Sequence, residues 1–331
     1  MAGICIYGAG SIGCYIGGRL AATGTPVTFI GRARMHDELS RHGLHLTDYR
    51  GADLRVAAAD IRYASTPEEI ARAAGDADLV LVTVKSAATA AAAGELAGML
   101  KPDAVVLSFQ NGLGNAGVLQ SGLPAFRVVA GMVPFNVVHH GDGHFHQGSE
   151  GHLDAAAHPG LAVFQPLFAR AGLPLVLQPD MTAVLWSKLL LNLNNPINAL
   201  SGIPLKAELS QRAYRRCLAM AQQEALALID AAGIRLIRLT PLPPSWIPRL
   251  MTVPDALFRL LANRMLQIDP LARSSMWEDL EAGRRTEIDW INGEVIRLAT
   301  RLGRHAPVNA CLVALIRAAE QGGERAWSGD A

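Results

Sequence analysis

The chain carries few charges and almost no excess of either sign. Only 18% of its 331 residues are charged, and 30 Lys and Arg residues stand against 29 Asp and Glu residues, a net charge of +1. A chain without a basic field has no general attraction for nucleic acid or for an anionic membrane. Half of the residues are hydrophobic, which is ample material for buried cores. We therefore expect a small-molecule partner, with no nucleic acid and no membrane.

Cysteine is also scarce. The four cysteines form no CxxC pair and lie far apart, at Cys5, Cys14, Cys217 and Cys311. This spacing argues against a disulfide framework or a zinc site and is typical of small buried side chains in a reducing compartment. The sequence also lacks a signal peptide and an uncharged apolar run of about 18 residues, which a membrane span would need. We expect a cytoplasmic protein.

Two kinds of pattern divide the chain, as its length also suggests. Short apolar runs alternate with Ala-rich helical stretches at first, and the runs are 4–7, 27–30, 79–84, 104–109 and 128–132. Such runs are typical of strands buried on both faces, so the alternation predicts a parallel, doubly wound α/β sheet. Helical patterns then dominate, over 184–200, 211–232, 254–266 and 277–302. We expect a first domain over 1–179 and an all-helical C-terminal domain over 180–331.

The first apolar run leads into a glycine-rich turn. Its residues are Gly8, Ala9, Gly10, Ser11, Ile12 and Gly13. In such a GxGxxG turn the glycines allow a tight bend, close approach of a pyrophosphate and close packing of helix on strand. The helix N-terminus then donates backbone amides to the phosphates. The motif alone is weak evidence, but here it follows a strand and precedes a helix and a second strand. We predict a Rossmann-type dinucleotide-binding domain rather than a purely structural turn.

The end of the second strand indicates which dinucleotide binds. Enzymes that use NAD usually place an acid here to accept a hydrogen bond from the ribose 2′-hydroxyl. This chain instead has Gly31-Arg32-Ala33-Arg34, and the next acid is Asp37. A guanidinium pairs with a 2′-phosphate, whereas a carboxylate would repel it. We therefore predict NADPH/NADP⁺ as cofactor, with Arg32 on the 2′-phosphate; the alternative is that Arg32 is a solvated loop charge.

Two more polar residues follow predicted strands, at the sheet edge where ligands bind. Lys85 could contact a phosphate, and Asn111 could orient the nicotinamide or the substrate. Each could equally be an ordinary cap or turn residue.

The best candidate for chemistry is at the start of the second domain. In the run Lys188-Leu-Leu-Leu-Asn192-Leu-Asn194-Asn195-Pro196, Lys188, Asn192 and Asn195 would share one face of a helix. A lysine among leucines is costly to bury, and burial would lower its pKa toward neutrality, as a proton donor requires. The alternative is a snorkelling lysine followed by asparagines that end the helix before Pro196.

Three other segments leave their roles open. Ser275 and Glu287 are twelve residues apart on an expected helix and could face one groove, although its many charges are more typical of a solvated face. Five histidines between 139 and 152 surround a Gly-Asp-Gly turn, which favours a surface hairpin over a metal site. The Pro-rich stretch 241–248 could be a surface loop or a flap; we favour the loop.

Together these motifs resemble ketopantoate reductase (2-dehydropantoate 2-reductase) over nearly the whole chain. The matching elements, in order, are the glycine turn, Lys85, Gln110-Asn111-Gly112, Lys188 with Asn192, and Ser274-Ser275-Met276 followed by the run 284–293. The resemblance implies an NADP-dependent oxidoreductase acting on CH–OH groups in pantothenate biosynthesis. It also implies a Rossmann domain and a helical domain with the active site in the cleft between them, in a monomer or homodimer.

The resemblance further implies roles for individual residues. Lys188 would be the general acid and Asn192 would hold the carbonyl or hydroxyl. Asn111 would lie near cofactor and substrate, Ser275 would contact the substrate carboxylate, and Glu287 would contact its hydroxyl and so face the cleft.

Two departures affect the substrate side. The family has a second Asn eight residues after the lysine, where this chain has Pro196, and we align Asn195 there by a one-residue deletion. The segment 233–272 is also longer than usual for the family. The alternatives are therefore a reductase of another 2-oxo or β-hydroxy acid, or a non-catalytic NADPH-binding protein.

Overall fold

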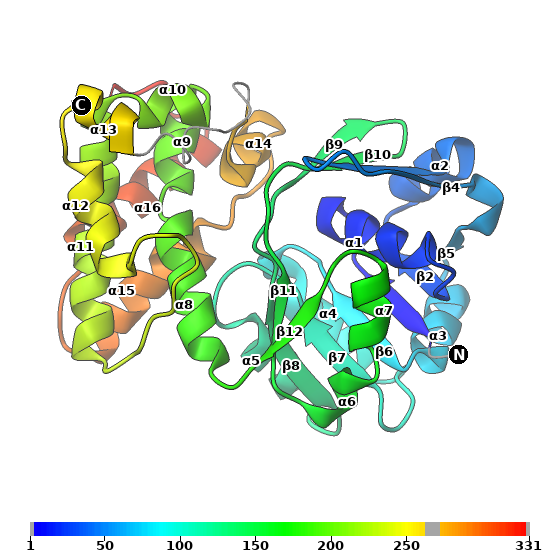
Figure 1. Ribbon diagram of the computed structural model, residues 1–331. Coiled ribbons are helices and arrows are strands. Elements are labelled where there is room, and N and C mark those ends of the chain that lie inside the picture. The colour runs from blue at the N-terminus through cyan, green and yellow to red at the C-terminus, as the bar shows by residue number, and fades with distance from the viewer. Residues whose placement is uncertain (1–2, 262–271, 329–331) are drawn as a thin grey trace. The chain divides into compact units, whose positions relative to one another are not determined.

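The chain divides into two compact units, Met1–Met181 and Thr182–Ala331. The computed structural model of the protein (Figure 1) describes residues 3–261 and 272–328. Within these residues, no helix has the length and apolar character that crossing a bilayer requires.

The first unit contains an eight-stranded sheet, ordered β12-β11-β8-β7-β6-β1-β2-β5. All neighbours run parallel except β11, which is antiparallel to β8. The bounds are β1 Ile4–Tyr7, β2 Val27–Ile30, β5 Arg62–Ala64, β6 Leu79–Val82, β7 Val105–Ser108, β8 Arg127–Met132, β11 Leu153–Ala156 and β12 Leu175–Gln178. All five predicted strands are present, so the α/β class and the doubly wound sheet are confirmed.

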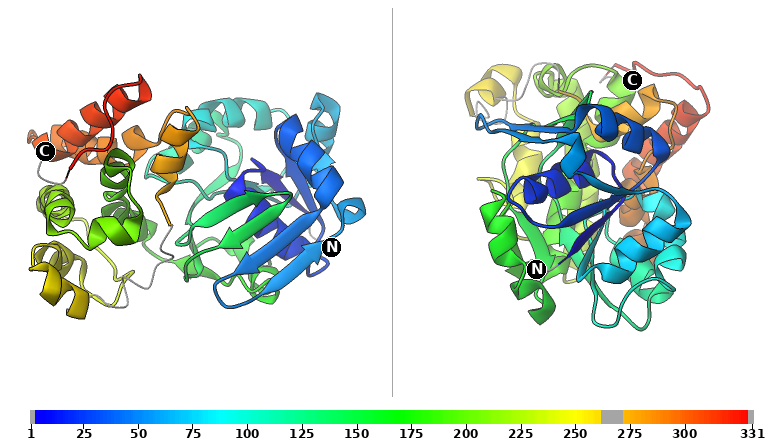
Figure 2. Two further views of the ribbon diagram at one scale, coloured as in Figure 1. Left: turned by 90° about the horizontal axis from the view of Figure 1, so that it is seen from above. Right: turned by 90° about the vertical axis from the view of Figure 1, so that its right-hand side faces the viewer.

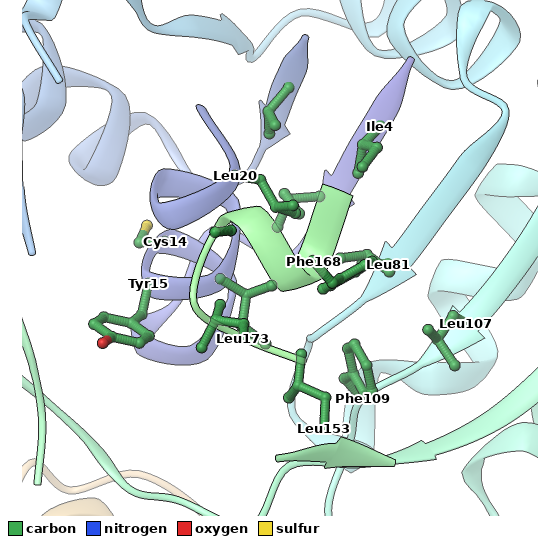
Figure 3. Close-up of a cluster of buried hydrophobic side chains, with 14 of the residues drawn as sticks. Ile4, Cys14, Tyr15, Leu20, Leu81, Leu107, Phe109, Leu153, Phe168 and Leu173 are labelled. Carbon is green, nitrogen blue, oxygen red and sulfur yellow. The ribbon is translucent and has the colours of Figure 1, made fainter. Parts of the chain in front are cut away.

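Helices cover both faces of this sheet because successive strand side chains point to opposite sides. Ile4 and Ile6 of β1 join one buried cluster, with residues of α1 and α7 (Figure 3), whereas Cys5 and Tyr7 join another, with residues of α3, α4 and α5. The helices of this unit are α1 Ser11–Ala21, α2 Ala33–His42, α3 Pro67–Asp76, α4 Thr89–Leu96, α5 Asn115–Gly122, α6 Pro159–Ala162 and α7 Gln165–Arg170; two short 3₁₀ turns are η1 Ala58–Asp60 and η2 Ser86–Ala88.

A second, four-stranded sheet, which the sequence patterns did not predict, lies in the same unit. Its order is β4-β3-β10-β9, so segments about a hundred residues apart lie side by side (Figure 2). The bounds are β3 Leu44–Asp48, β4 Asp53–Val56, β9 Val137–Gly141 and β10 His144–Gln147. The predicted hairpin is confirmed: β9 and β10 are antiparallel, and Gly141, at the end of β9, and the linking Asp142 and Gly143 all have positive φ.

The regular elements among the described residues of the second unit are all helices. The bounds are α8 Met181–Asn192, α9 Asn195–Ser201, α10 Leu205–Leu209, α11 Arg212–Ala231, α12 Ile247–Met251, α13 Asp255–Leu261, α14 Ser275–Glu281, α15 Asn292–Arg301 and α16 Pro307–Glu320, with 3₁₀ turns η3 Pro244–Trp246 and η4 Ile288–Trp290. The predicted helix 211–232 is confirmed by α11. The expected helix 254–266 is α13 up to Leu261, and its remainder lies outside the described residues.

Two expected helices are wrong as continuous elements. The helix over 184–200 is divided into α8 and α9, because Pro196 has no N–H with which to continue the helical ladder. The helix over 277–302 is divided as well. Gly283 has φ +62°, and the Gly283 and Arg284 amides donate to the carbonyls of Leu280 and Asp279, a Schellman motif that ends α14.

Arg215 of α11 connects four helices of this unit. Its side chain is fully buried and donates to the carbonyls of Leu209, Met251 and Val253, at the ends of α10 and α12 and just before α13. It also pairs with Asp255 at 2.8 Å. A buried guanidinium is tolerated because its donors are matched by these acceptors.

Candidate functional site

The glycine-rich turn joins β1 to α1. At two of its glycines, Gly8 and Gly13, neighbouring atoms leave no room for a side chain. Gly8 has φ +115°, and a Cβ there would lie 2.7 Å from the Val84 backbone nitrogen. A Cβ at Gly13 would lie 2.3 Å from the Gly8 oxygen and 2.6 Å from Thr83 Oγ1. The Thr83 hydroxyl donates to that same Gly8 oxygen at 2.7 Å. The first turn of α1 is thus packed directly on the ends of β1 and β6.

Gly10, between these two glycines, faces open space. A Cβ added to it would meet no atom within 4 Å. Gly10 is the N-cap of α1, no side chain caps the helix, and its first turn holds no acidic residue. The positive end of the helix dipole is therefore available to an anion. This cradle fits the diphosphate of a dinucleotide such as NADPH.

Arg32 directly follows the short link after β2. It is the N-cap of α2, its side chain is exposed, and the first turn of α2 contains no acidic residue. Its carbonyl oxygen accepts a hydrogen bond from the Tyr63 hydroxyl at 3.1 Å, which fixes the backbone there. A guanidinium without an adjacent carboxylate at this strand end fits a 2′-phosphate.

Lys85 and Asn111 follow β6 and β7, which are neighbours in the sheet. The Asn111 carbonyl accepts hydrogen bonds from Ser86 Oγ at 3.0 Å and from Asn115 Nδ2 at 2.5 Å. Thr89 Oγ1 in turn donates to Asn115 Oδ1 at 2.9 Å. These bonds bring the segments that carry Lys85 and Asn111 together. The lysine side chain is exposed and Asn111 is partly exposed.

Sequence reasoning missed the three polar residues that hold these segments. Ser86, Thr89 and Asn115 are all buried, at 2–3% exposure. Gln110, which was part of the resemblance, completes the network by donating to Thr89 Oγ1 and to the Val84 carbonyl. The signal that could have found them is the grouping of small polar residues within seven positions of the ends of two buried strands.

Lys188 lies on the apolar helix α8, and Asn192 follows one turn later at its end. The protein atoms around the Lys188 ammonium remove most of its water and lower its pKa to about 8, although the residue as a whole keeps some exposed surface. The side chains of Lys188, Asn192 and Asn195 are all partly exposed, whereas Leu189 and several neighbours are buried. The Lys–Asn pair therefore has the predicted i, i+4 spacing. The argument that placed Asn195 on the same continuous helical face is wrong, because a turn separates α8 from α9.

Ser275 and Glu287 do not lie on one helix, so the spacing argument for their common face is also wrong. Ser275 is the first residue of α14, and its side chain is partly exposed. Glu287 is buried and immediately precedes η4. Thr286 holds this segment, because both its amide and its hydroxyl donate to Glu320 Oε1 at 2.7 Å.

Three of the histidines between 139 and 146 have partners on α2 or in the smaller sheet. His139 Nε2 lies 2.5 Å from Glu38 Oε1, and Thr47 Oγ1 lies 2.8 Å from ring nitrogens of both His144 and His146. Over residues 3–261 and 272–328, no three His, Cys, Asp or Glu side chains are grouped as ligands for a metal ion.

The Pro-rich stretch lines a surface cavity of about 630 Å³ within the second unit. Its walls come from α11 and from the segment that leads into α12, and include Gln223, Asp230, Ile234, Pro244 and Arg249. None of the predicted site residues lines this cavity.

Comparison with known proteins matches both units. The family model described as ketopantoate reductase PanE/ApbA matches residues 4–160, and the model of its C-terminal part matches residues 180–320. The 2-dehydropantoate 2-reductase of Halobacterium salinarum is 30% identical over 332 residues, covering 97% of this chain and 99% of the relative.

Solved structures agree. A PanE/ApbA family ketopantoate reductase from Ralstonia eutropha JMP134 superposes with a TM-score of 0.80 at 31% identity, covering 96% of this chain and 98% of that one. A D-mandelate dehydrogenase with NADH and anilino(oxo)acetate has a TM-score of 0.77 at 19% identity, with 96% and 98% covered, and shares the fold. The matches over both units confirm the resemblance seen in the motifs: the chain belongs to the ketopantoate reductase family.

Proposed function

We propose that this protein reduces the C2 ketone of 2-dehydropantoate (ketopantoate) to the alcohol of pantoate, with NADPH as reductant, in pantothenate biosynthesis. Conversion of a ketone to an alcohol needs one hydride on carbon and one proton on oxygen. The observation that carries the proposal is Lys188 on the apolar helix α8, with its pKa lowered to about 8, one turn before Asn192 in a chain of this family.

The first unit, 1–179 in our assignment, would hold the cofactor. Gly8 to Gly13 and the amides at the start of α1 would bind the diphosphate, and Arg32 would pair with the 2′-phosphate. Lys85 would contribute a further positive charge and Asn111 would orient the nicotinamide end. NADPH, when bound, supplies the hydride; the chain's own residues bind it and set its orientation.

The second unit, 180–331, would supply the substrate contacts and the proton. Lys188 would donate a proton to the oxygen of the ketone as negative charge develops there, because its lowered pKa makes it a competent acid near neutrality. Asn192 and Asn195 would hydrogen-bond that oxygen and the substrate. Ser275 would bind the substrate carboxylate, and Glu287 would accept a hydrogen bond from its hydroxyl group.

A panel of 2-oxo acids tests the substrate. We expect ketopantoate to give the highest kcat/KM with NADPH. An analogue that lacks the hydroxyl group would leave Glu287 without its hydrogen-bond partner, which should cost about 1–3 kcal/mol of binding free energy. The measurement is steady-state NADPH oxidation with ketopantoate and with a matched 2-oxo acid that lacks the hydroxyl. Preferred turnover of the analogue would assign the chain to another 2-oxo acid; cofactor binding without any turnover would support a non-catalytic role.

Substitution of Arg32 tests the cofactor. In Arg32→Ala, we expect the Kd for NADPH to rise about 10-fold to 100-fold, since charge-assisted hydrogen bonds contribute about 1.5–3 kcal/mol. The Kd for NADH should change little, because NADH has no 2′-phosphate. Arg41→Ala is the control, an exposed arginine at the other end of α2. Equal losses for the two cofactors would refute the assignment of Arg32.

Substitution of Lys188 tests the proton donor. Lys188→Ala should lower kcat at least about 100-fold, the usual effect of removing a general acid. Lysine donates a proton only while it is charged, so kcat/KM of the native enzyme should fall as the pH rises through about 8. Lys206→Ala, at an exposed lysine of α10, should retain native activity. A Lys188→Ala variant with near-native kcat would contradict the mechanism.

Two glycine substitutions separate folding from cofactor binding. Gly10→Ala should keep a near-native Tm but bind NADPH at least about tenfold more weakly, because the new methyl group enters the space reserved for the diphosphate. Gly13→Ala should lower the Tm itself, since its Cβ would overlap the Gly8 carbonyl. Thermal unfolding and fluorescence titration with NADPH measure both effects; native affinity in Gly10→Ala would show that the diphosphate lies elsewhere.

A further inference from the structure

Glu208 of α10 is a fully buried carboxyl group to which neither the motifs nor the proposed mechanism assigns a role. Its exposure is 0%, and its Oε2 accepts a hydrogen bond from Asn198 Nδ2 at 2.6 Å. Burial raises the pKa of Glu208 to about 7. An acid this deeply buried is costly unless its neighbours compensate it or it is neutral.

Asn198 connects this carboxyl group to the start of α14. Asn198 is also fully buried, and its Oδ1 accepts a hydrogen bond from the Ser274 backbone amide at 2.8 Å. The Ser274 hydroxyl donates to the Asn195 carbonyl at 3.2 Å and accepts from the Trp277 amide at 3.2 Å. One chain of contacts thus runs from Glu208 through Asn198 to the turn that precedes Ser275. The same turn is tied to Asn195.

Two side-chain oxygens at this site lack a donor. Among the described residues, Glu208 Oε1 and Asn194 Oδ1 are buried side-chain oxygens without a hydrogen-bond partner. Asn194 and Asn198 both form side-chain hydrogen bonds with the Glu208 carboxyl group that lower its pKa, but burial outweighs them and the net shift is upward. A proton on Glu208 Oε1 would supply the donor that this site needs, whereas an ionised carboxylate would add only acceptors.

Two arginines on the neighbouring elements have partners other than Glu208. Arg215 of α11 binds the Leu209 carbonyl and Asp255, and Arg273, before α14, donates to the Gly202 carbonyl. Lys206 of α10 itself is exposed. Glu208 thus has the two amides, Asn194 and Asn198, as its polar neighbours in this network.

We propose that Glu208 is a positioning residue that acts in its neutral form, through Asn198 and Ser274, to hold Ser275 and Asn195 where they contact the substrate. This inference rests on the proposed function, because that proposal assigns Ser275 and Asn195 to the substrate. Glu208 itself touches neither substrate nor cofactor in this scheme. Loss of the network should therefore raise the KM for the oxo acid more than it changes kcat or the KM for NADPH.

Two substitutions of Glu208 separate its neutral form from its charge. Gln can accept from Asn198 and donate to Asn194, as a neutral carboxylic acid can, whereas Ala can do neither. At pH 6 we expect Glu208→Gln to keep the KM for ketopantoate within about twofold, and Glu208→Ala to raise it about tenfold, the effect of one buried hydrogen bond. Glu281→Gln, at an exposed acid of α14, is the control and should leave this KM unchanged.

The pH dependence gives a second readout. Because the native carboxyl group ionises near pH 7, the KM of the native enzyme should rise between about pH 6 and pH 8, and that of Glu208→Gln should rise less. Unfolded Glu208 loses its proton near its ordinary pKa of 4.5, so its contribution to native stability is lost as the pH rises from 4.5 through about 7. The Tm of Glu208→Gln should accordingly exceed the native Tm by more at pH 8 than at pH 5.

Failure of the proposed reaction and failure of the role of Glu208 give different results. If the native enzyme does not reduce ketopantoate, the proposed function fails, and amide hydrogen exchange at Ser274 still tests the network: Glu208→Ala should accelerate it and Glu208→Gln should not. If the native enzyme is active but both variants keep the native KM, Glu208 has no positioning role. If Glu208→Gln raises the KM as much as Glu208→Ala does, Glu208 does not act in its neutral form.

Discussion

Burying a polar atom without a hydrogen-bond partner costs free energy, and hydrogen bonds among buried polar side chains organise both units. In the first unit, Ser86, Thr89 and Asn115 satisfy one another and the Asn111 carbonyl, which holds together the segments after β6 and β7. In the second unit, Asn198 does the same for α9, α10 and α14. The hydrophobic clusters make the elements stable, whereas these hydrogen bonds determine where the candidate site residues lie.

The parts of the structure that the sequence predicted depend on short-range patterns. The five predicted strands of the large sheet are contiguous apolar runs, whereas β5 and β11 contain charged residues and were not predicted. The glycine turn is recognised from six adjacent residues, and the Lys188–Asn192 spacing from five. The smaller sheet depends instead on pairing of β3 with β10, about a hundred residues later, and neither strand is apolar enough to stand out. Long-range pairing of half-polar strands leaves no local signal.

The errors in the helical unit have a common physical cause. The periodicity of 184–200 and of 277–302 continues across breaks that single residues impose, Pro196 through its missing N–H and Gly283 through its positive φ. A face argument based on 3.6 residues per turn fails beyond such a break. The positions of Asn195, Ser275 and Glu287 are therefore set by tertiary hydrogen bonds through Ser274 and Thr286, which no single-sequence pattern displays.

Burial raises the pKa of an acid and lowers the pKa of a base. In the second unit both effects bring a pKa closer to neutral pH. Removing water disfavours charge, so the pKa of Lys188 falls to about 8 and the pKa of Glu208 rises to about 7. A proton donor such as Lys188 needs its charged form, whereas the role proposed for Glu208 needs the neutral form. The two requirements are met together on the acid side of both pKa values. Burial is the largest cause of both shifts, and in Glu208 it outweighs the hydrogen bonds of Asn194 and Asn198, which act in the opposite direction.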